Sequence, residues 1–246
     1  IGSLFTEGNH LFIDDKHPLK QQALDTMMQS LEILEQRFNA KMVVLRDFSE
    51  HDNLHPYFQG QGFVRVQMPN SCTIDLEVDI TIENYVSKLS SRNRQHVRKE
   101  ILKYESLLNI EVVKTGDKEQ LKQIQQLYAN VHQNNLGLNT FSFPEKLFDN
   151  MSEHPNWEFI TVSLLEKPTQ IIGVMLCYNN ENHTYVPAFV GMDYQFLSEF
   201  YTYRQLLYQT IKRAIDLKFQ HIDLGMTASF EKRKLGATVE EKYAYI

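Results

Sequence analysis

Three apolar segments in close succession constrain the fold of this chain more than any other feature. They cover residues 157–165, 170–178 and 184–191. The turns between them are short and polar, which predicts an antiparallel meander. A helix is predicted over 203–219, because apolar residues recur there at three- and four-residue spacing. With a further strand over 221–225, this order of elements predicts an α+β or mixed α/β protein.

The remainder of the chain divides into elements of the same kinds. Up to residue 108 we expect helices over 18–38, 81–89 and 92–107, and strands over 41–47, 63–68 and 73–78. Beyond it we expect a strand over 109–114, helices over 118–134 and 144–151, and a terminal strand over 239–245. Ser90 or Ser91 can cap the helix from 92, and Asp117 the helix from 118, because their side-chain oxygens accept from the first-turn N–H groups.

The charge balance argues against a protein dedicated to duplex DNA. Lys and Arg total 25 against 31 Asp and Glu, a formal net charge of −6, whereas duplex-binding proteins usually carry an excess of base. Positive residues gather in two places, 88–103 and 232–234. Such local patches fit a small polyanionic ligand better than a nucleic-acid track, and a solvated helix face is the alternative for the first patch.

Several other classes are disfavoured. No apolar run approaches the ~18 residues of a membrane-spanning helix, so no membrane span is expected. Cys72 and Cys177 are too few for a disulfide framework, which predicts a reduced, cytoplasmic setting. His51 and His55 have the spacing of a helical zinc pair, but Pro56 follows and no third ligand is near, so we expect no metal. Because the sequence starts at Ile1 rather than Met, we expect a processed chain or part of a longer protein.

Three segments resemble those of a known enzyme group. Residues 85–99, Tyr-Val-Ser-Lys-Leu-Ser-Ser-Arg-Asn-Arg-Gln-His-Val-Arg-Lys, resemble the L-S-S-K-x-R-x-x-I-R-R connector of the Fem-like N-acyltransferases, which have tandem GNAT-like halves. Residues 230–237, Phe-Glu-Lys-Arg-Lys-Leu-Gly-Ala, resemble their late F-x-K-x-x-F/L-G motif. Residues 58–66 are similar to the Gly-Phe strand entry near the end of GNAT domains. The resemblance implies a GNAT-like acyltransferase fold, with a largely antiparallel mixed sheet flanked by helices.

The resemblance also implies a division of the chain. Residues 1–80 would form a partial first GNAT-like half, 81–108 a basic helical connector and 109–246 a second GNAT-like half. A loose repeat in the order helix, strand, loop, glycine and strand, starting at 18 and again at 203, fits a duplicated domain.

The activity implied by the resemblance is N-acyl transfer. An acyl or aminoacyl group would move from an activated donor to a small-molecule amine by direct attack, the donor being acyl-CoA, such as acetyl-CoA, or aminoacyl-tRNA. Ordinary GNAT enzymes cradle the acyl-CoA pyrophosphate on a glycine-rich loop before the long helix. Residues 193–204 contain no glycine, which favours the Fem-like branch. The alternative is a non-catalytic ligand- or partner-binding module that keeps the fold. No feature indicates an oligomeric state.

Acyl transfer to an amine needs a hydrogen-bond donor for the developing oxyanion and an acceptor for the departing proton. The backbone of Ala188–Gly191 is the candidate oxyanion donor. Asp193 and Asp223, at strand ends, are candidates to take the proton or orient the amine, and a turn-forming role is the alternative for each. Tyr203, at the start of the long helix, is a third candidate catalytic residue.

Anionic groups of the donor or acceptor need positive partners. The candidates are Arg94, Arg98, Arg204, Lys232 and Lys234, together with Tyr185 on the strand expected to face the donor. Arg204 opens the long helix, where N–H groups and a guanidinium suit a phosphate, and a solvated Arg is the alternative. Lys232 matches the lysine of the late family motif. Arg94 and Arg98 are four residues apart and share a helical face, from which they can bind phosphate or brace the two halves.

Overall fold

The computed structural model describes residues 8, 10–114, 117–134, 142–181 and 183–246. They form two compact units. One contains residues up to Ser71 together with Glu240–Ile246, and the other contains Cys72–Val239. The chain passes between the units within β2 (Arg65–Asp75) and within β8 (Thr238–Tyr245). The domain boundaries at 80/81 and 108/109 follow from the resemblance and stay a prediction.

The smaller unit contains α1 (Lys20–Phe38), β1 (Leu45–Ser49) and α2 (His55–Gly60). β1 pairs antiparallel with β8, with Leu45 opposite Tyr245. Its core is aromatic, because the Phe58 ring lies 5.3 Å from that of Phe48 and 4.7 Å from that of Tyr245. Leu24 and Met28 of α1 join this core, so the helical spacing of the first helix is confirmed.

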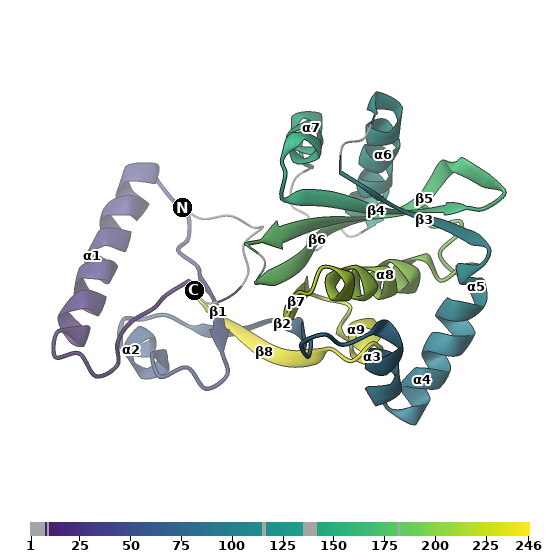
Figure 1. Cartoon of the computed structure of the whole chain (residues 1–246). Helices are drawn as coiled ribbons and strands as arrows, with labels where there is room; N and C mark the ends of the chain where they lie inside the picture. Colours follow the sequence, from purple (N-terminus) through teal and green to yellow (C-terminus); the bar gives the residue numbers. More distant parts are fainter. Residues whose placement is uncertain (1–7, 9, 115–116, 135–141, 182) are drawn as a thin grey trace. The chain divides into compact units, whose positions relative to one another are not determined.

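The larger unit is built on the predicted meander, which is confirmed (Figure 1). β3 (Leu108–Val113), β4 (Trp157–Leu164), β5 (Lys167–Asn180) and β6 (Thr184–Met192) pair antiparallel in that order. β7 (His221–Met226) then pairs parallel with β6. The prediction of a mixed α/β fold with a largely antiparallel sheet flanked by helices is therefore confirmed.

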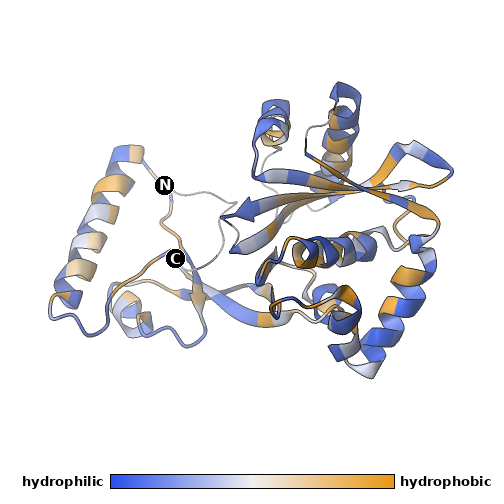
Figure 2. Ribbon diagram, in the orientation of Figure 1, coloured by the Kyte–Doolittle hydropathy of each residue, from blue (hydrophilic) through white to orange (hydrophobic). Residues whose placement is uncertain are grey.

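Helices cover both faces of this sheet (Figure 1). α6 (Lys118–Asn134) and α7 (Glu145–Glu153) pack on one face, and α8 (Thr202–Asp216) packs on the other. Each long helix shows hydrophobic and hydrophilic stripes side by side, as expected for amphipathic helices (Figure 2). Two glycines allow the close approach: a Cβ at Gly191 would lie 2.7 Å from the Tyr128 backbone N of α6, and one at Gly173 would lie 2.5 Å from the Thr202 side chain of α8.

The basic connector is more irregular than predicted. In place of one helix over 92–107, α4 (Ser91–Val97) continues into a π-helical segment, η1 (Arg98–Leu102), and then α5 (Lys103–Glu105). Ser90 caps α4, since its Oγ accepts from Asn93 N at 3.2 Å. The carbonyl of Ile101 accepts from Gln205 Nε2 of α8 at 2.7 Å. This tertiary hydrogen bond gives a partner to a carbonyl in the π-helical segment.

Two further elements differ from prediction. The strands expected over 63–68 and 73–78 are one continuous strand, β2. The basic residues 232–234, for which no helix was predicted, belong to a short helix, α9 (Ser229–Lys234). α3 (Ile82–Lys88) matches the expected helix, and Thr81 caps it by accepting from Asn84 N at 3.3 Å.

Candidate active site

β6 and β7 begin side by side but pair over a short length. The register joins Thr184 to His221 and Tyr185 to Ile222. Residues 186–192 of β6 and 223–226 of β7 have no partner across this pair. The two strands therefore form a fork, closed at residues 184–185 and open toward the carboxyl ends. Ligands of α/β proteins commonly bind at the carboxyl ends of parallel strands, which makes the open end the candidate site.

A β-bulge lies on β6 within the open part of the fork. Leu176 of β5 faces Phe189, whereas the next residue, Cys177, faces Pro187. Ala188 is the extra residue between them. A bulge disrupts the ladder locally and re-aims backbone groups, and this one falls where the sequence places the oxyanion donor. That role for Ala188–Gly191 stays a prediction.

A buried polar cluster holds the closed end of the fork. Arg213 of α8 donates to Glu158 of β4 from Nε at 2.9 Å and from Nη2 at 2.8 Å, and Tyr185 donates its hydroxyl to Glu158 Oε1 at 2.7 Å. Burial alone would raise the pKa of Glu158, but these hydrogen bonds more than offset it and the pKa is lowered. Burial raises the pKa of Tyr185. Tyr185, expected to contact a donor or acceptor, thus lies fully buried in the core.

Asp193 and Asp223 lie at the two ends of the fork's open part. Asp193 follows β6, and its Oδ1 accepts from Gln195 N at 3.0 Å. Asp223, predicted at a strand end, lies instead within β7, and its Oδ1 accepts from Gly225 N at 2.9 Å. Both are half-buried. Each carboxylate therefore makes the turn contact weighed as its alternative role, and proton transfer by either stays a prediction.

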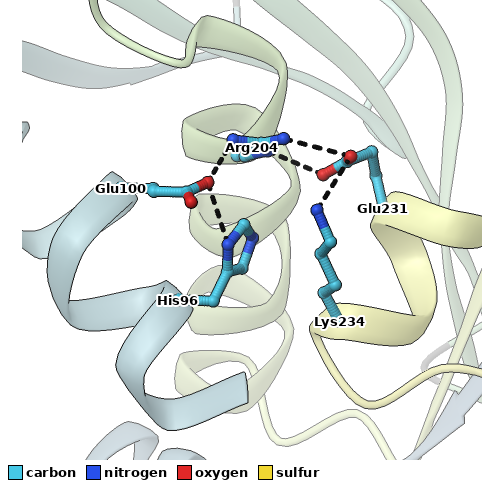
Figure 3. Close-up of polar contacts among 5 residues, drawn as sticks. All are labelled: His96, Glu100, Arg204, Glu231 and Lys234. Carbon is cyan, nitrogen blue, oxygen red and sulfur yellow. Dashed lines mark hydrogen bonds and ion pairs between the residues drawn. The ribbon is translucent and has the colours of Figure 1, made fainter. Parts of the chain in front are cut away.

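A polar network joins α8 and α9, the helices that follow β6 and β7, to α4 and η1 of the basic connector (Figure 3). Arg204 of α8 donates to Glu231 of α9 from Nε at 2.6 Å and from Nη2 at 3.1 Å, and from Nη1 to Glu100 of η1. His96 Nδ1 lies 2.9 Å from Glu100 Oε2, and Lys234 Nζ lies 3.1 Å from Glu231 Oε1. Arg204 and Lys234, two predicted anion-binding residues, are thus each matched by a carboxylate of the chain.

Burial and charge shift the pKa values in this network. Desolvation, together with the positive charges of Lys234 and Arg204, lowers the pKa of His96 more than Glu100 raises it. The Glu231 hydrogen bond raises the pKa of Arg204. Burial opposes ionisation of Glu231, but the Arg204 and Lys234 hydrogen bonds lower its pKa. His96 Nε2 is buried without a hydrogen-bond partner among the residues that the structure describes.

The family assignment rests on a match between the sequence and a family model. The family model described as "Acetyltransferase (GNAT) domain" matches residues 91–233, more than half of the chain. The chain belongs to this GNAT family. The match begins at α4 and ends within α9, so it contains the fork and every residue of the network except Lys234. A search of the curated proteins gives no significant match.

Solved structures share the fold of this GNAT protein. The structure titled "Crystal structure of FemX" has a TM-score of 0.60 at 14% identity, over 92% of this chain and 77% of that one. L-PGS from Bacillus licheniformis has a TM-score of 0.58 at 12% identity, over 89% and 71%. A GCN5-related N-acetyltransferase from Sphaerobacter thermophilus has a TM-score of 0.56 at 11% identity, over 93% and 69%. The resemblance to the Fem-like GNAT fold is therefore confirmed.

The remaining predicted site residues of the GNAT domain make structural contacts or lie exposed. Arg94 Nη1 donates to the carbonyls of Leu89 at 2.5 Å and Ser87 at 3.2 Å, which ties α3 to α4. Arg98 lies exposed on η1. Tyr203 is half-buried on α8, and burial raises its pKa. Their roles in catalysis or binding stay predictions.

Lys232 is buried, with 3% of its surface exposed. Its Nζ donates to the carbonyls of Met226 at 2.7 Å and Gly225 at 3.1 Å, at the end of β7. The backbone here is unusual, because Gly225, Thr227 and Ala228 all have positive φ, of 70°, 65° and 46°. A β-branched residue in this region is strained. The Lys232 ammonium thus holds a strained turn beside the fork.

Across the described ranges, no group of three or more His, Cys, Asp and Glu side chains is placed to hold a metal ion. Within the same residues, no helix is both long and apolar enough to cross a bilayer. Cys72 and Cys177 are buried and unbridged, and burial raises the pKa of Cys177 to about 12.

Proposed function

We propose that this GNAT protein is an N-acyltransferase that moves an acyl or aminoacyl group from an activated donor to a small-molecule amine by direct attack. The observation that carries the proposal is the fork between β6 and β7, with its bulge at Ala188. Membership of the GNAT acetyltransferase family supports the reaction class. The acyl group of the donor would enter the open part of the fork.

The reaction needs one bond to form and one to break at the donor carbonyl. The amine nitrogen attacks the carbonyl carbon, and the C=O electrons move onto oxygen, where backbone N–H groups of Ala188–Gly191 stabilise the oxyanion. The oxyanion collapses and expels the thiolate of CoA or the ribose oxygen of tRNA. The amine loses one proton to Asp193 or Asp223, and the leaving group gains one. The product is an amide.

The charged residues restrict how the donor binds. Arg204 and Lys234 already pair with Glu231 and Glu100, so a donor phosphate would compete with these carboxylates. Arg98 is exposed and available to a phosphate. The glycine-free segment 193–204 supports aminoacyl-tRNA over acyl-CoA, because a pyrophosphate cradle needs close backbone approach. Cys72 and Cys177 are unbridged thiols, which fits a reducing compartment, and we place the reaction in the cytoplasm.

Asparagine variants test the proton step separately from the fold. Asp193→Asn and Asp223→Asn keep an Oδ1 that accepts the same turn hydrogen bond, but the amide cannot take a proton. We expect one of them to lower transfer by about 100-fold or more, with an unchanged melting temperature. The assay detects the amide product by mass spectrometry after incubation with acetyl-CoA, longer acyl-CoAs or charged tRNA and a panel of amines. Full activity in both variants would contradict the proton step, and no product with any donor would contradict transfer itself.

A non-catalytic binding module is the second candidate, and the internal pairing of Arg204 and Lys234 favours it. Such a module would bind a ligand or a partner without turnover. A thermal shift with a donor, together with no amide product, would select this alternative.

A further inference from the structure

A pocket in the larger unit lies apart from the fork's open end. It has a volume of about 330 Å³, within the range of small-molecule sites. Its walls come from the end of β2, the loop that follows, α3, the start of α4 and Gly236. The loop is joined to the start of β7 by the hydrogen bond from Leu76 N to the Gln220 carbonyl, at 2.7 Å. The pocket therefore lies beside the strand end where β6 and β7 pair.

Hydrogen bonds and close packing hold the pocket walls. Tyr85 donates its hydroxyl to the Leu235 carbonyl at 2.5 Å, and Asn93 Nδ2 donates to the Arg233 carbonyl at 3.3 Å. Gly236 has a φ of +99°, and a Cβ there would lie 2.7 Å from the Tyr85 hydroxyl. These contacts join α3 and α4 to α9 and to the segment that follows it. The pocket is therefore preformed, which lowers the cost of binding.

The floor of the pocket is apolar and its rim is charged. Ile74 and Leu89 are buried beneath it. The rim carries two carboxylates, Asp75 and Glu77, and one ammonium, Lys88. Lys88 pairs with Glu77, and Asp75 Oδ1 lies 2.7 Å from His221 Nδ1. Counting histidine as neutral, the rim therefore has one unbalanced negative charge.

We propose that this pocket binds a primary amine that carries a compact apolar group. One ligand ammonium would balance the rim, and its apolar body would cover the floor. An anionic ligand would instead meet two carboxylates with one ammonium available. The Lys88–Glu77 pair is exposed, so rearranging it costs little. The inference concerns binding alone and does not depend on acyl transfer at the fork.

Three probes of equal shape separate charge from apolar contact. 3-Methylbutylamine, 3-methylbutan-1-ol and 3-methylbutanoate are titrated into the 15N-labelled protein at low ionic strength, where charge is screened least. The amides of Gly236, Ser90 and Asn93 report binding. We expect saturable shifts with the amine, at least about fivefold weaker binding of the alcohol, and no shift with the carboxylate. No shift with the amine, or equal binding of amine and alcohol, would overturn the proposal.

Variants of the rim give effects of opposite sign. Glu77→Gln should weaken amine binding about threefold to fivefold, and Lys88→Met should strengthen it, because it removes the competing ammonium. Glu83→Gln is the matched control, since Glu83 is an exposed residue of α3 outside the pocket lining. It should change binding by less than half of the Glu77→Gln effect. All three positions are exposed, and a melting curve checks that each variant folds. Equal effects of Glu77→Gln and Glu83→Gln, or weaker binding by Lys88→Met, would contradict the assignment.

Discussion

Arg213 donates two parallel hydrogen bonds to Glu158, from Nε to Oε1 at 2.9 Å and from Nη2 to Oε2 at 2.8 Å. The pair joins α8 to strand β4 of the sheet on which this helix packs. Tyr185 of β6 donates to the same carboxylate. A buried carboxylate is stable only while its partners satisfy it. The closed end of the fork therefore depends on the Arg213 guanidinium, which is 55 positions from Glu158 in the sequence.

Removing the Arg213 side chain should destabilise the larger unit. Arg213→Ala leaves Glu158 buried and without its charge partner. We expect a loss of about 2 kcal/mol in the free energy of unfolding, less than for a fully buried pair because the Arg213 side chain is 25% exposed. Urea denaturation measures it. Lys212→Ala is the control, since its pair with Glu105 at 3.5 Å is more exposed. Equal effects of the two variants would contradict the role of the pair.

The contact of α6 with β6 predicts a strong effect at Gly191. A Cβ there would lie 2.7 Å from the Tyr128 backbone N and 2.9 Å from the Leu127 carbonyl carbon. Backbone cannot move aside as a flexible side chain can, so Gly191→Ala should cost about 2 kcal/mol. Gly60→Ala, whose Cβ meets nothing within 4 Å, should be neutral or slightly stabilising. A melting temperature for Gly191→Ala equal to that of the parent would rule out the close packing.

The lowered pKa of His96 predicts a loss of stability in mild acid. Its folded-state pKa is lowered, so the unfolded chain binds the proton more readily. The stabilising contribution is fully present above the unfolded pKa of about 6.5 and is lost as the pH falls below it. His96→Gln should flatten this part of the stability curve between about pH 7.5 and pH 5.5. His51→Gln, at a side chain 91% exposed, should leave it unchanged. A curve unaltered by His96→Gln would refute the assignment.

The contribution of Glu231 to stability also depends on pH, but in a lower pH range than that of His96. Its folded-state pKa is below the ordinary value of 4.5, so its contribution is present above that value and is lost only as the pH falls below it. Glu231→Gln should therefore change the stability curve in stronger acid than His96→Gln does. Chemical denaturation across the pH range separates the two residues. A Glu231 effect confined to pH 5.5–7.5 would be inconsistent with the lowered pKa.

Lys232 should contribute mainly to the stability of the fold. Lys232→Met removes the ammonium that donates to the carbonyls of Gly225 and Met226, and we expect a loss of about 2 kcal/mol. Lys234→Met, in the same helix but at a partly exposed ion pair, should cost less than about 1 kcal/mol. Thermal denaturation at fixed salt compares them. A larger loss for Lys234→Met would reverse the roles assigned to these two lysines.

Local sequence patterns predicted much of the fold. The short polar turns between apolar segments predicted the meander. Ser90 and Asp117 cap the helices that they were expected to cap. α9 was missed because it is one short helix whose N-cap, Ala228, has a left-handed conformation and no capping side chain. The π-helical segment was missed because the Gln205 contact to the Ile101 carbonyl spans 104 positions. Such long-range contacts leave no local pattern.

The site was predictable only in part for the same reason. Sequence reasoning selected Arg204 and Lys234 but not Glu231 or Glu100, which pair with them. It also missed Glu158 and Arg213, whose pairing depends on the order of strands in the sheet. The helical basic spacing and the family motif identified cations. Which of them stay free for a ligand depends on carboxylates brought close by the fold.

Hydrogen exchange of the β6 backbone tests most directly whether the fork holds the donor. The protein is exposed to deuterium with and without a donor analogue that cannot transfer its acyl group, either a thioether analogue of acetyl-CoA or an amide-linked aminoacyl-tRNA. We expect slower exchange at Ala188–Gly191 with one of them, and unchanged exchange in α1. Unchanged exchange at Ala188–Gly191 at analogue concentrations that saturate a thermal shift would contradict it.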